Sequence, residues 1–162
     1  MDKKEFNRIV KDVFTQYGFQ KRRERYYLFF DEITISCQLY TWNGVRSFNY
    51  WVSVNAAYDD SIPLEQRYGS YLAIKMEHSP SAEGYHKAEI AYEKYDEAEC
   101  RRILNGLLHS YFDPFLQDAT QYVKDHYEEL HIKSDGVKQL GIEDHRLRFI
   151  PPLITDSPLA QS

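Results

Sequence analysis

The sequence predicts an α+β protein in which helices pack on one face of a mainly antiparallel sheet of about five strands. Two observations carry this prediction. Apolar residues recur at three- and four-residue spacing in an early and a late segment of the chain, which is typical of amphipathic helices. Between these segments, runs of alternating apolar and polar residues are bounded by Gly, Asn, Asp and Pro, which is typical of half-buried strands. We therefore expect helix, strands and helices in that order, with the helices on the apolar face.

The chain begins with a predicted helix that ends near Gly18. Asp2 and Glu5 have the spacing of a capping box, and Gly18 stands where a left-handed C-terminal cap is favoured. The apolar stripe of this helix comprises Phe6, Ile9, Val10, Val13, Phe14 and Tyr17.

The strongest local signal is a β-hairpin formed by residues 33–40 and 45–56. Asn43-Gly44 lies between these runs and is the preferred central pair of a two-residue type I′ turn. If this turn sets the register, every cross-strand pair on one face is apolar. The predicted pairs are Leu39 with Phe48, Cys37 with Tyr50, Ile35 with Val52 and Ile33 with Val54.

Two further hairpins are expected. Residues 26–30 precede Asp31-Glu32, and a two-residue turn there places Phe30 opposite Ile33, Leu28 opposite Ile35 and Tyr26 opposite Cys37. The alternating runs 72–76 and 88–92, linked by a turn-rich stretch, predict a second, shorter hairpin.

A helical period returns after Asp96, and two helices are predicted at this end. Asp113-Pro114 reads as an N-cap followed by proline at the first helical position, so we expect a new helix to start there and run to about Leu130. Residues 1–132 form a single predicted α+β domain, and residues 133–162 form an irregular tail or a docked arm.

Composition limits the function classes. The 20 basic and 25 acidic residues give a formal charge of −5, which disfavours nucleic acid as a partner. The basic run 21–25 is expected to be a solvated loop, or else a local contact for an anion or acidic partner. No apolar run approaches the ~20 residues that span a bilayer, and no signal-peptide core is present, so we expect a cytoplasmic protein without membrane contact.

The sequence contains no motif typical of an enzyme, a metal site or a cofactor site. Phosphate loops, nucleophile elbows and helical metal-ligand pairs are missing. Cys37 and Cys100 fall on apolar faces and are expected in the core, although a thiol in the first turn of a helix can be reactive. We expect no cofactor and no catalytic residues.

The polar face of the predicted meander is the candidate binding surface. Its rings, amides and guanidinium group suit the centre of a protein interface or a flat ligand site. Ordinary exposure of these residues, or their covering by a second layer such as the C-terminal arm, is the competing interpretation. The candidate residues are Arg25, Tyr27, Phe29, Gln38, Tyr40, Asn49 and Trp51.

These observations favour a non-enzymatic recognition protein, such as an inhibitor or immunity-type partner of another protein. A homodimer formed through the same face is also compatible with the pattern. The alternative is a small-molecule-binding protein, or an enzyme without a known motif, whose pocket lies near residues 58–70 with Asp59, Asp60 or Arg67 as polar groups.

The order of features in residues 6–58 also resembles a known family. These features are the helix ending in Gly18-Phe19, the basic run, Tyr26-Tyr27, the strand 35–40 and the strand 50–56 with Val54-Asn55. This order resembles the bacterial family catalogued as domain of unknown function 4304. Residues 67–69 and the closing helices match the pattern of that family only loosely. The resemblance implies a small α+β cytosolic bacterial domain and assigns no activity or functional residue. The tail after Leu130 departs from the family pattern.

Overall fold

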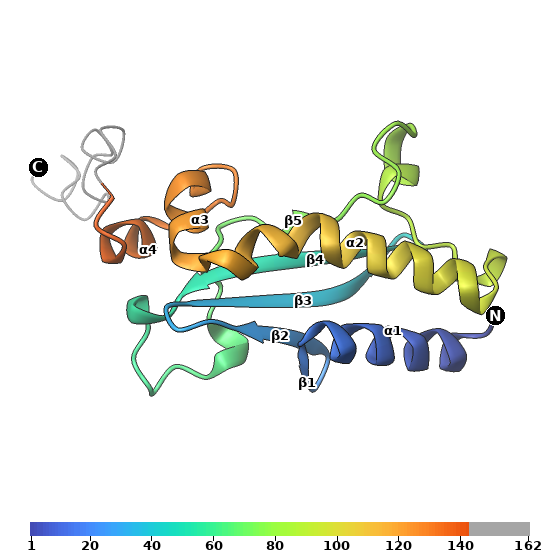
Figure 1. Cartoon of the computed structure of the whole chain (residues 1–162), viewed down its shortest axis with the longest axis horizontal. Coiled ribbons are helices and arrows are strands. Elements are labelled where there is room, and N and C mark those ends of the chain that lie inside the picture. Colours follow the sequence, from blue (N-terminus) through green and yellow to red (C-terminus); the bar gives the residue numbers. More distant parts are fainter. Residues whose placement is uncertain (143–162) are drawn as a thin grey trace, which may run out of the picture.

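The computed structural model describes residues 1–142 and confirms the α+β fold (Figure 1). Within these residues, one five-stranded antiparallel sheet has its strands in sequence order, so every connection joins neighbours. The strands are β1 (Gln20–Arg22), β2 (Arg25–Phe29), β3 (Ile33–Trp42), β4 (Val45–Val54) and β5 (Ile74–Lys75).

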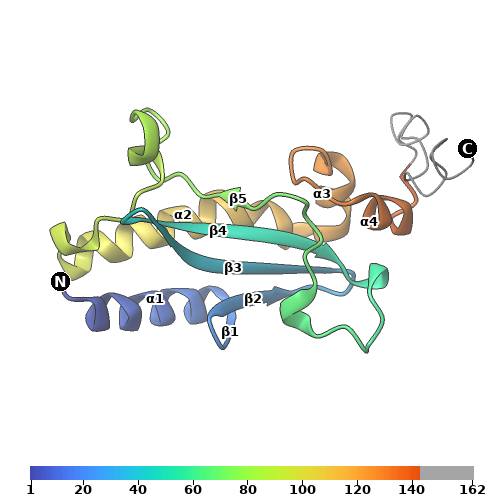
Figure 2. The same ribbon diagram turned by 180° about the vertical axis from the view of Figure 1, so that it is seen from behind.

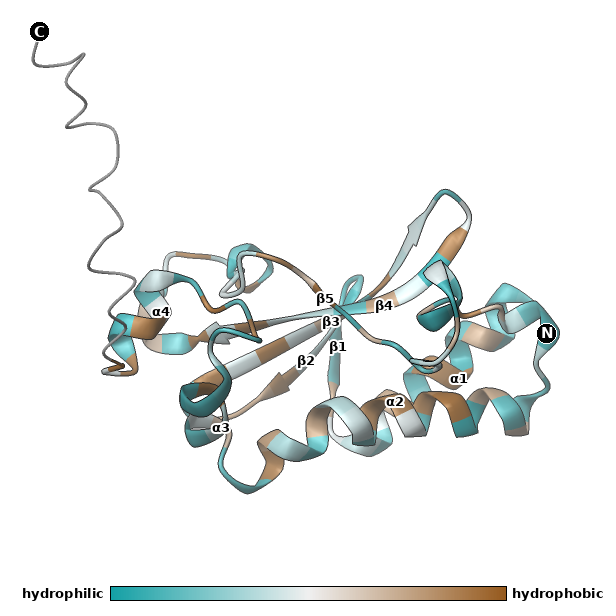
Figure 3. Ribbon diagram, turned by 90° about the horizontal axis from the view of Figure 1, so that it is seen from above, coloured by the Kyte–Doolittle hydropathy of each residue, from teal (hydrophilic) through white to brown (hydrophobic). Residues whose placement is uncertain are grey.

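The helices α1, α2 and α3 lie on one side of this sheet (Figure 3). Seen from above, α1 and α2 run next to each other on that side, and α3 follows α2 (Figure 3). The α-helices are α1 (Lys3–Tyr17), α2 (Glu97–Gln117), α3 (Ala119–His126) and α4 (Ser134–Gln139). Short 3-10 helices are η1 (Asn55–Ala57), η2 (Leu64–Gln66), η3 (Gly84–Lys87) and η4 (Tyr92–Lys94).

The predicted signals of the first helix are confirmed. The Asp2 side chain accepts a hydrogen bond of 2.8 Å from the backbone N–H of Glu5, and the N–H of Gly18 bonds the carbonyls of Phe14 and Thr15. The stripe is buried apart from the half-buried Tyr17, so α1 packs its apolar face on the sheet as the spacing predicts.

The predicted register of the central hairpin is also confirmed for every pair. Asn43 and Gly44 have φ values of 51° and 77°, as a type I′ turn requires at both central positions. The inner face of β3 and β4 is therefore apolar from the pair of Ile33 and Val54 to the pair of Leu39 and Phe48. It joins α1, α2 and α3 in one core, with Ile33, Ile35, Cys37 and Val52 fully buried.

The turn at Asp31-Glu32 keeps the predicted register between β2 and β3, but it is not a primed turn, because neither residue has a positive φ. Asn55 supplies the stabilisation that these two residues lack. Its side-chain amide donates to the carbonyls of Phe30 and Asp31, and its backbone N–H donates to the carbonyl of Glu32 at 2.8 Å.

The hairpin predicted for residues 72–76 and 88–92 is wrong. Only Ile74 and Lys75 form a strand, and they pair with β4, while residues 88–92 lie in no strand. Ala88, Ile90 and Tyr92 are buried, so the alternation of that run arose from burial against the core, whereas in the other run Met76 is buried and Leu72 is exposed. The fifth strand is instead β1, formed by the start of the basic run that was expected to be a loop.

The boundary between the late helices also differs from the prediction. α2 continues through Pro114 to Gln117, and α3 starts after Asp118, whose side chain accepts from the N–H of Gln121. Proline at this position removes a single backbone hydrogen bond in the last turn of α2. Burial of Phe112 and Phe115 on either side keeps the turn helical.

The segment predicted as a tail or docked arm begins with α4. Gly136 and Val137 of this helix are buried, and α4 packs against η1 and the end of β4. Residues 143–162, the rest of that segment, lie outside the described residues.

Candidate functional site

The outer face of the sheet, opposite the helices, has a covered part and an open part. Residues 58–73 leave η1, pass through η2 and cross in front of the strands before reaching β5 (Figure 2). This segment lies over the end of the sheet where β4 finishes. The other end, at the β3–β4 turn, stays open.

The covering segment is fixed to β4 by close backbone contact. A Cβ atom on Gly69 would lie 2.2 Å from the carbonyl oxygen of Val52, so only glycine allows this approach. The Ser70 hydroxyl accepts from the N–H of Val52 at 3.0 Å and donates to the carbonyl of Leu130 at 2.9 Å. A polar sheet face thus acquires a second layer, which accounts for the burial of Thr34, Ser36 and Ser53.

Arg25 is held firmly where the covering segment meets β2. Its Nε donates to Oε1 of Gln38 at 3.1 Å, and its Nη2 donates to the hydroxyl of Tyr68 at 2.6 Å. The guanidinium carbon lies 5.0 Å from the ring centre of Trp51 and 4.6 Å from that of Tyr68. All these partners are neutral, so none of them compensates the positive charge of Arg25.

Several buried polar atoms of this face have no hydrogen-bond partner among residues 1–142. They are Nη1 of Arg25, the hydroxyl of Tyr27, Oγ of Ser36 and Oδ1 of Asn49. Burial, and to a smaller extent the nearby Glu65 carboxylate, raise the pKa of Tyr27, whereas the charge of Arg25 and a weak hydrogen-bonding contact with it oppose that rise. Buried polar atoms are normally paired, so a cluster of exceptions calls for a ligand or water.

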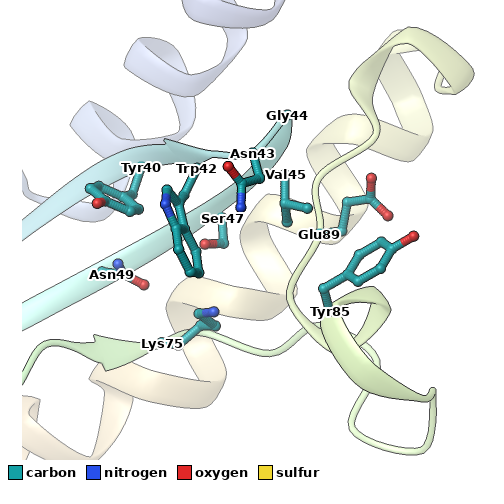
Figure 4. A pocket seen from close by; sticks show the side chains of 10 residues that line it. All are labelled: Tyr40, Trp42, Asn43, Gly44, Val45, Ser47, Asn49, Lys75, Tyr85 and Glu89. Atoms are coloured by element: carbon teal, nitrogen blue, oxygen red, sulfur yellow. The ribbon is translucent and has the colours of Figure 1, made fainter.

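The open part forms a pocket of about 580 Å³ at the β3–β4 turn. The rings of Tyr40 and Trp42 stand on one wall, Tyr85 and Glu89 line the other side on the segment that contains η3, and Lys75 lies between the two sides (Figure 4). Trp42 is 66% exposed, and Tyr40 and Tyr85 are 47% and 55% exposed. Three large rings therefore meet solvent around one concave surface.

The structure separates the candidate residues of the sequence into three positions. Arg25, Tyr27, Gln38 and Trp51 lie in or beside the covered part, and Tyr40 and Asn49 line the open pocket. Phe29 stacks on Tyr27 with ring centres 5.9 Å apart and remains 39% exposed.

Trp42, Tyr68, Lys75 and Tyr85 were missed. Trp42 could have been found, because it continues the alternation of the outer face of β3. Tyr68 lies in a loop and Tyr85 in the four-residue helix η3, neither of which has a readable period, and their place on the face is set by tertiary contacts.

The described thiols do not favour nucleophilic chemistry. Cys37 is fully buried with its Sγ 3.8 Å from Sδ of Met76, and burial raises its pKa strongly. Burial also raises the pKa of Cys100 to about 11, so both thiols stay protonated at neutral pH. In the part of the chain that the structure describes, no group of three or more His, Cys, Asp or Glu is placed to hold a metal ion.

The polar residues around positions 58–70 mainly stabilise their own segment. The Asp59 carboxylate accepts from the backbone and the hydroxyl of Ser61, which lowers its pKa. Arg67 donates to the carbonyls of Ile62 and Asp59. The cavity beside Tyr58 holds about 130 Å³, below the usual size of a small-molecule site.

No helix among residues 1–142 has the length and apolar character needed to cross a bilayer. In comparisons with protein-family models, curated proteins and solved structures, nothing matched this chain. The geometry of the outer face is therefore the feature of the molecule that bears on its function.

Proposed function

We propose that this protein is a non-enzymatic recognition domain that binds a partner protein through the open part of its outer face. The observation that carries the proposal is the set of three exposed rings, Tyr40, Trp42 and Tyr85, around one pocket of about 580 Å³. Tyrosine and tryptophan dominate the energetic centres of protein interfaces, because they bury large apolar areas at low entropic cost.

The surroundings of the rings support a protein partner. Ser47, Asn49, Lys75 and Glu89 place hydroxyl, amide and charged groups around the aromatic surface. This arrangement of an aromatic centre and a polar rim is typical of protein interfaces. The pocket lies on the hydrogen-bonded β3–β4 hairpin, so its main wall is preorganised and ordering it costs little on binding.

The proposal is tested with the double variant Tyr40→Ala/Trp42→Ala. The wild type and the variant are immobilised, and proteins captured from a lysate of the source organism are identified by mass spectrometry. A protein lost from the variant is then purified and titrated against both forms. We expect its Kd to rise at least about a hundredfold, because two interface rings are removed.

The matched control is Leu116→Ala, since Leu116 is also a large exposed apolar residue but lies on α2. Both variants should keep the far-ultraviolet circular dichroism and melting temperature of the wild type. Equal affinity of the purified partner for the Tyr40/Trp42 variant and the wild type would contradict the proposal. Light scattering of the wild type adds a direct test of the homodimer, which the double variant should dissociate if a second copy is the partner.

A small molecule is the second candidate, because the pocket volume lies within the ~300–1,000 Å³ range of ligand sites. Native mass spectrometry of the purified protein tests it. A bound mass that is lost in Trp42→Ala, together with no partner protein, would favour the small molecule. The family resemblance, with the bacterial cytosolic setting that it implies, stays a prediction.

A further inference from the structure

The basic run lies on the outer face outside the aromatic pocket, and its arginines differ from others in the chain in their ion pairing. Arg8, Arg46, Arg101 and Arg102 each form an ion pair with a carboxylate. Within residues 1–142, Arg22, Arg23 and Arg25 form none. In a chain with a formal charge of −5, three neighbouring arginines without a carboxylate partner stand out.

These arginines share a second pocket. It holds about 240 Å³ and is lined by Arg22, Arg23, Glu24, Arg25, Gln38, Glu65 and Tyr68. The lining carries three cations and two carboxylates, so the pocket is net positive. Glu65 lines it without forming an ion pair with Arg25. Since Nε and Nη2 of this arginine are bonded to Gln38 and Tyr68, Nη1 is the guanidinium nitrogen left for an incoming carboxylate.

The innermost groups of this corner are two buried donors that no carboxylate satisfies. Nη1 of Arg25 and the hydroxyl of Tyr27 are both buried and unpartnered, and Tyr27 is only 1% exposed. Burial raises the pKa of Tyr27, and the charge of Arg25 and a weak hydrogen-bonding contact with Arg25 both oppose that rise. The two groups therefore lie next to each other, although neither Nη1 of Arg25 nor the Tyr27 hydroxyl has a hydrogen bond of normal geometry. One carboxylate can accept from a guanidinium and a hydroxyl at once, and such charge-assisted bonds are short and strong.

We infer that this corner is a carboxylate-binding subsite, in which Arg25 and Tyr27 receive an Asp or Glu side chain from an acidic segment of the partner protein. This inference rests on the proposed function, since it names the chemistry of the partner. Tyr68 lies over the guanidinium and lines the pocket, so its ring is the group that moves to admit the carboxylate. Arg22 and Arg23, both exposed, attract the acidic segment over a longer range.

The acidic segment has a path to the aromatic pocket. Gln38, which lines the arginine pocket, is directly paired with Asn49, which lines the aromatic pocket. The two pockets are therefore neighbours on the same face of the sheet. A partner segment that fills both would present acidic side chains at one end and apolar ones at the other.

The two tryptophans make the inference measurable site by site, because Trp51 packs on Arg25 and Trp42 lines the aromatic pocket. The probe is N-acetyl hexaglutamate amide, followed through the indole N–H signals in ¹H–¹⁵N spectra, which Trp42→Phe assigns. We expect the Trp51 signal to move with the probe and to move less as salt is raised. Hexaglutamine amide, the neutral matched probe, should leave it in place.

Arg25→Gln is the decisive variant, and we expect it to weaken hexaglutamate binding about tenfold or more, because a hydrogen-bonded charge is lost. Arg102→Gln is the matched control, since Arg102 is an exposed arginine on α2, and it should bind as the wild type does. Arg25 also supports Trp51 and Tyr68, so Tyr27→Phe is the second variant. It removes one hydroxyl without changing the packing and should still weaken binding severalfold.

Equal binding by Arg25→Gln, Tyr27→Phe and Arg102→Gln would overturn the inference, as would an equal response to hexaglutamine. Tighter binding of hexathymidylate than of hexaglutamate would also overturn it in favour of a nucleic acid. The two proposals fail separately. If Tyr40→Ala/Trp42→Ala loses the partner but Arg25→Gln binds hexaglutamate normally, only the carboxylate subsite is rejected. If Tyr40→Ala/Trp42→Ala binds the partner normally but Arg25→Gln binds hexaglutamate weakly, only the aromatic docking surface is rejected.

Discussion

Gly69 shows how one residue sets the second layer of the sheet. Its backbone lies so close to β4 that a side chain would meet the Val52 carbonyl and the Ser53 Cα at 2.2 and 2.3 Å. The next residue, Ser70, is 2% exposed and bonds β4 and the carbonyl of Leu130. The connection between η2 and β5 therefore depends on the absence of a Cβ at this residue.

Gly69→Ala should lower the free energy of unfolding by about 2–3 kcal/mol, because backbone atoms cannot yield to the new methyl group as a flexible side chain would. Gly106→Ala is the control, and we expect it to raise the free energy of unfolding. Gly106 is exposed inside α2 with nothing near its Cβ position, so alanine should stabilise the protein by about 0.5–1 kcal/mol. Urea denaturation measures both. A neutral Gly69→Ala variant would show that the segment is held differently.

The two cysteines should be unreactive in the folded protein. Both thiols are buried and their pKa values are raised by burial, so little thiolate forms at pH 8. We expect a chromogenic disulfide reagent to modify neither cysteine under native conditions and both in 6 M guanidinium. Modification of Cys37 within minutes in the native protein would mean that the sheet opens far more easily than its packing implies.

At the scale of elements, a polar contact joins α1 to α2 at the edge of the core. The Tyr17 hydroxyl donates to Oδ1 of Asp113 at 2.8 Å, and Nδ1 of His109 lies 2.9 Å from the same oxygen. The bond from Tyr17, followed by the effect of His109, lowers the pKa of Asp113. The two helices are thus connected at one end by a hydrogen-bonded carboxylate.

Tyr17→Phe should raise the pKa of Asp113 toward its ordinary value of about 3.9. Because the folded-state pKa of Asp113 is lowered, its contribution to stability is present above that ordinary value and is lost as the pH falls through the folded-state value. The stability difference between the wild type and Tyr17→Phe should therefore shrink below about pH 4. Carboxyl titration by NMR and urea denaturation at pH 3 and pH 7 measure the two effects. A difference that grows on acidification would contradict this account.

At the scale of the whole molecule, the two faces of the sheet are stabilised differently. The helical face carries one continuous core in which β3 and β4 contact α1, α2 and α3 through buried apolar side chains. The outer face is covered by residues 58–73 at one end and open at the other. Stability should consequently be greatest in β3 and least in the segments that flank the outer face.

Hydrogen exchange should reflect this gradient. The amides of β3, which pairs with β2 and β4, should exchange only through global unfolding, whereas those of residues 79–89 should exchange through local opening. Exchange followed by NMR or mass spectrometry checks the order. Protection of residues 79–89 equal to that of β3 would contradict it.

The sequence was sufficient where structure depends on neighbouring positions. The stripe and caps of α1, the Asn43-Gly44 turn and the register that follows from it are local patterns, and all are confirmed. The prediction was wrong for residues 88–92, where burial of every second residue produced an alternating pattern without a strand. It also missed β1, because a three-residue strand that is fully exposed shows no alternation of apolar and polar residues. The Asp113-Pro114 pair predicted that one helix ends and another begins there, but α2 continues to Gln117 because Phe112 and Phe115 are packed in the core.

The candidate site was partly predictable for the same reason. Alternation along β2, β3 and β4 determined which side chains share the outer face, including Arg25, Tyr40 and Trp51. Only the tertiary structure decided that Tyr68 lies over Arg25 while Tyr40 and Trp42 remain open to solvent. Contacts between distant segments have no local period, because their free energy depends on which surfaces the rest of the fold brings together.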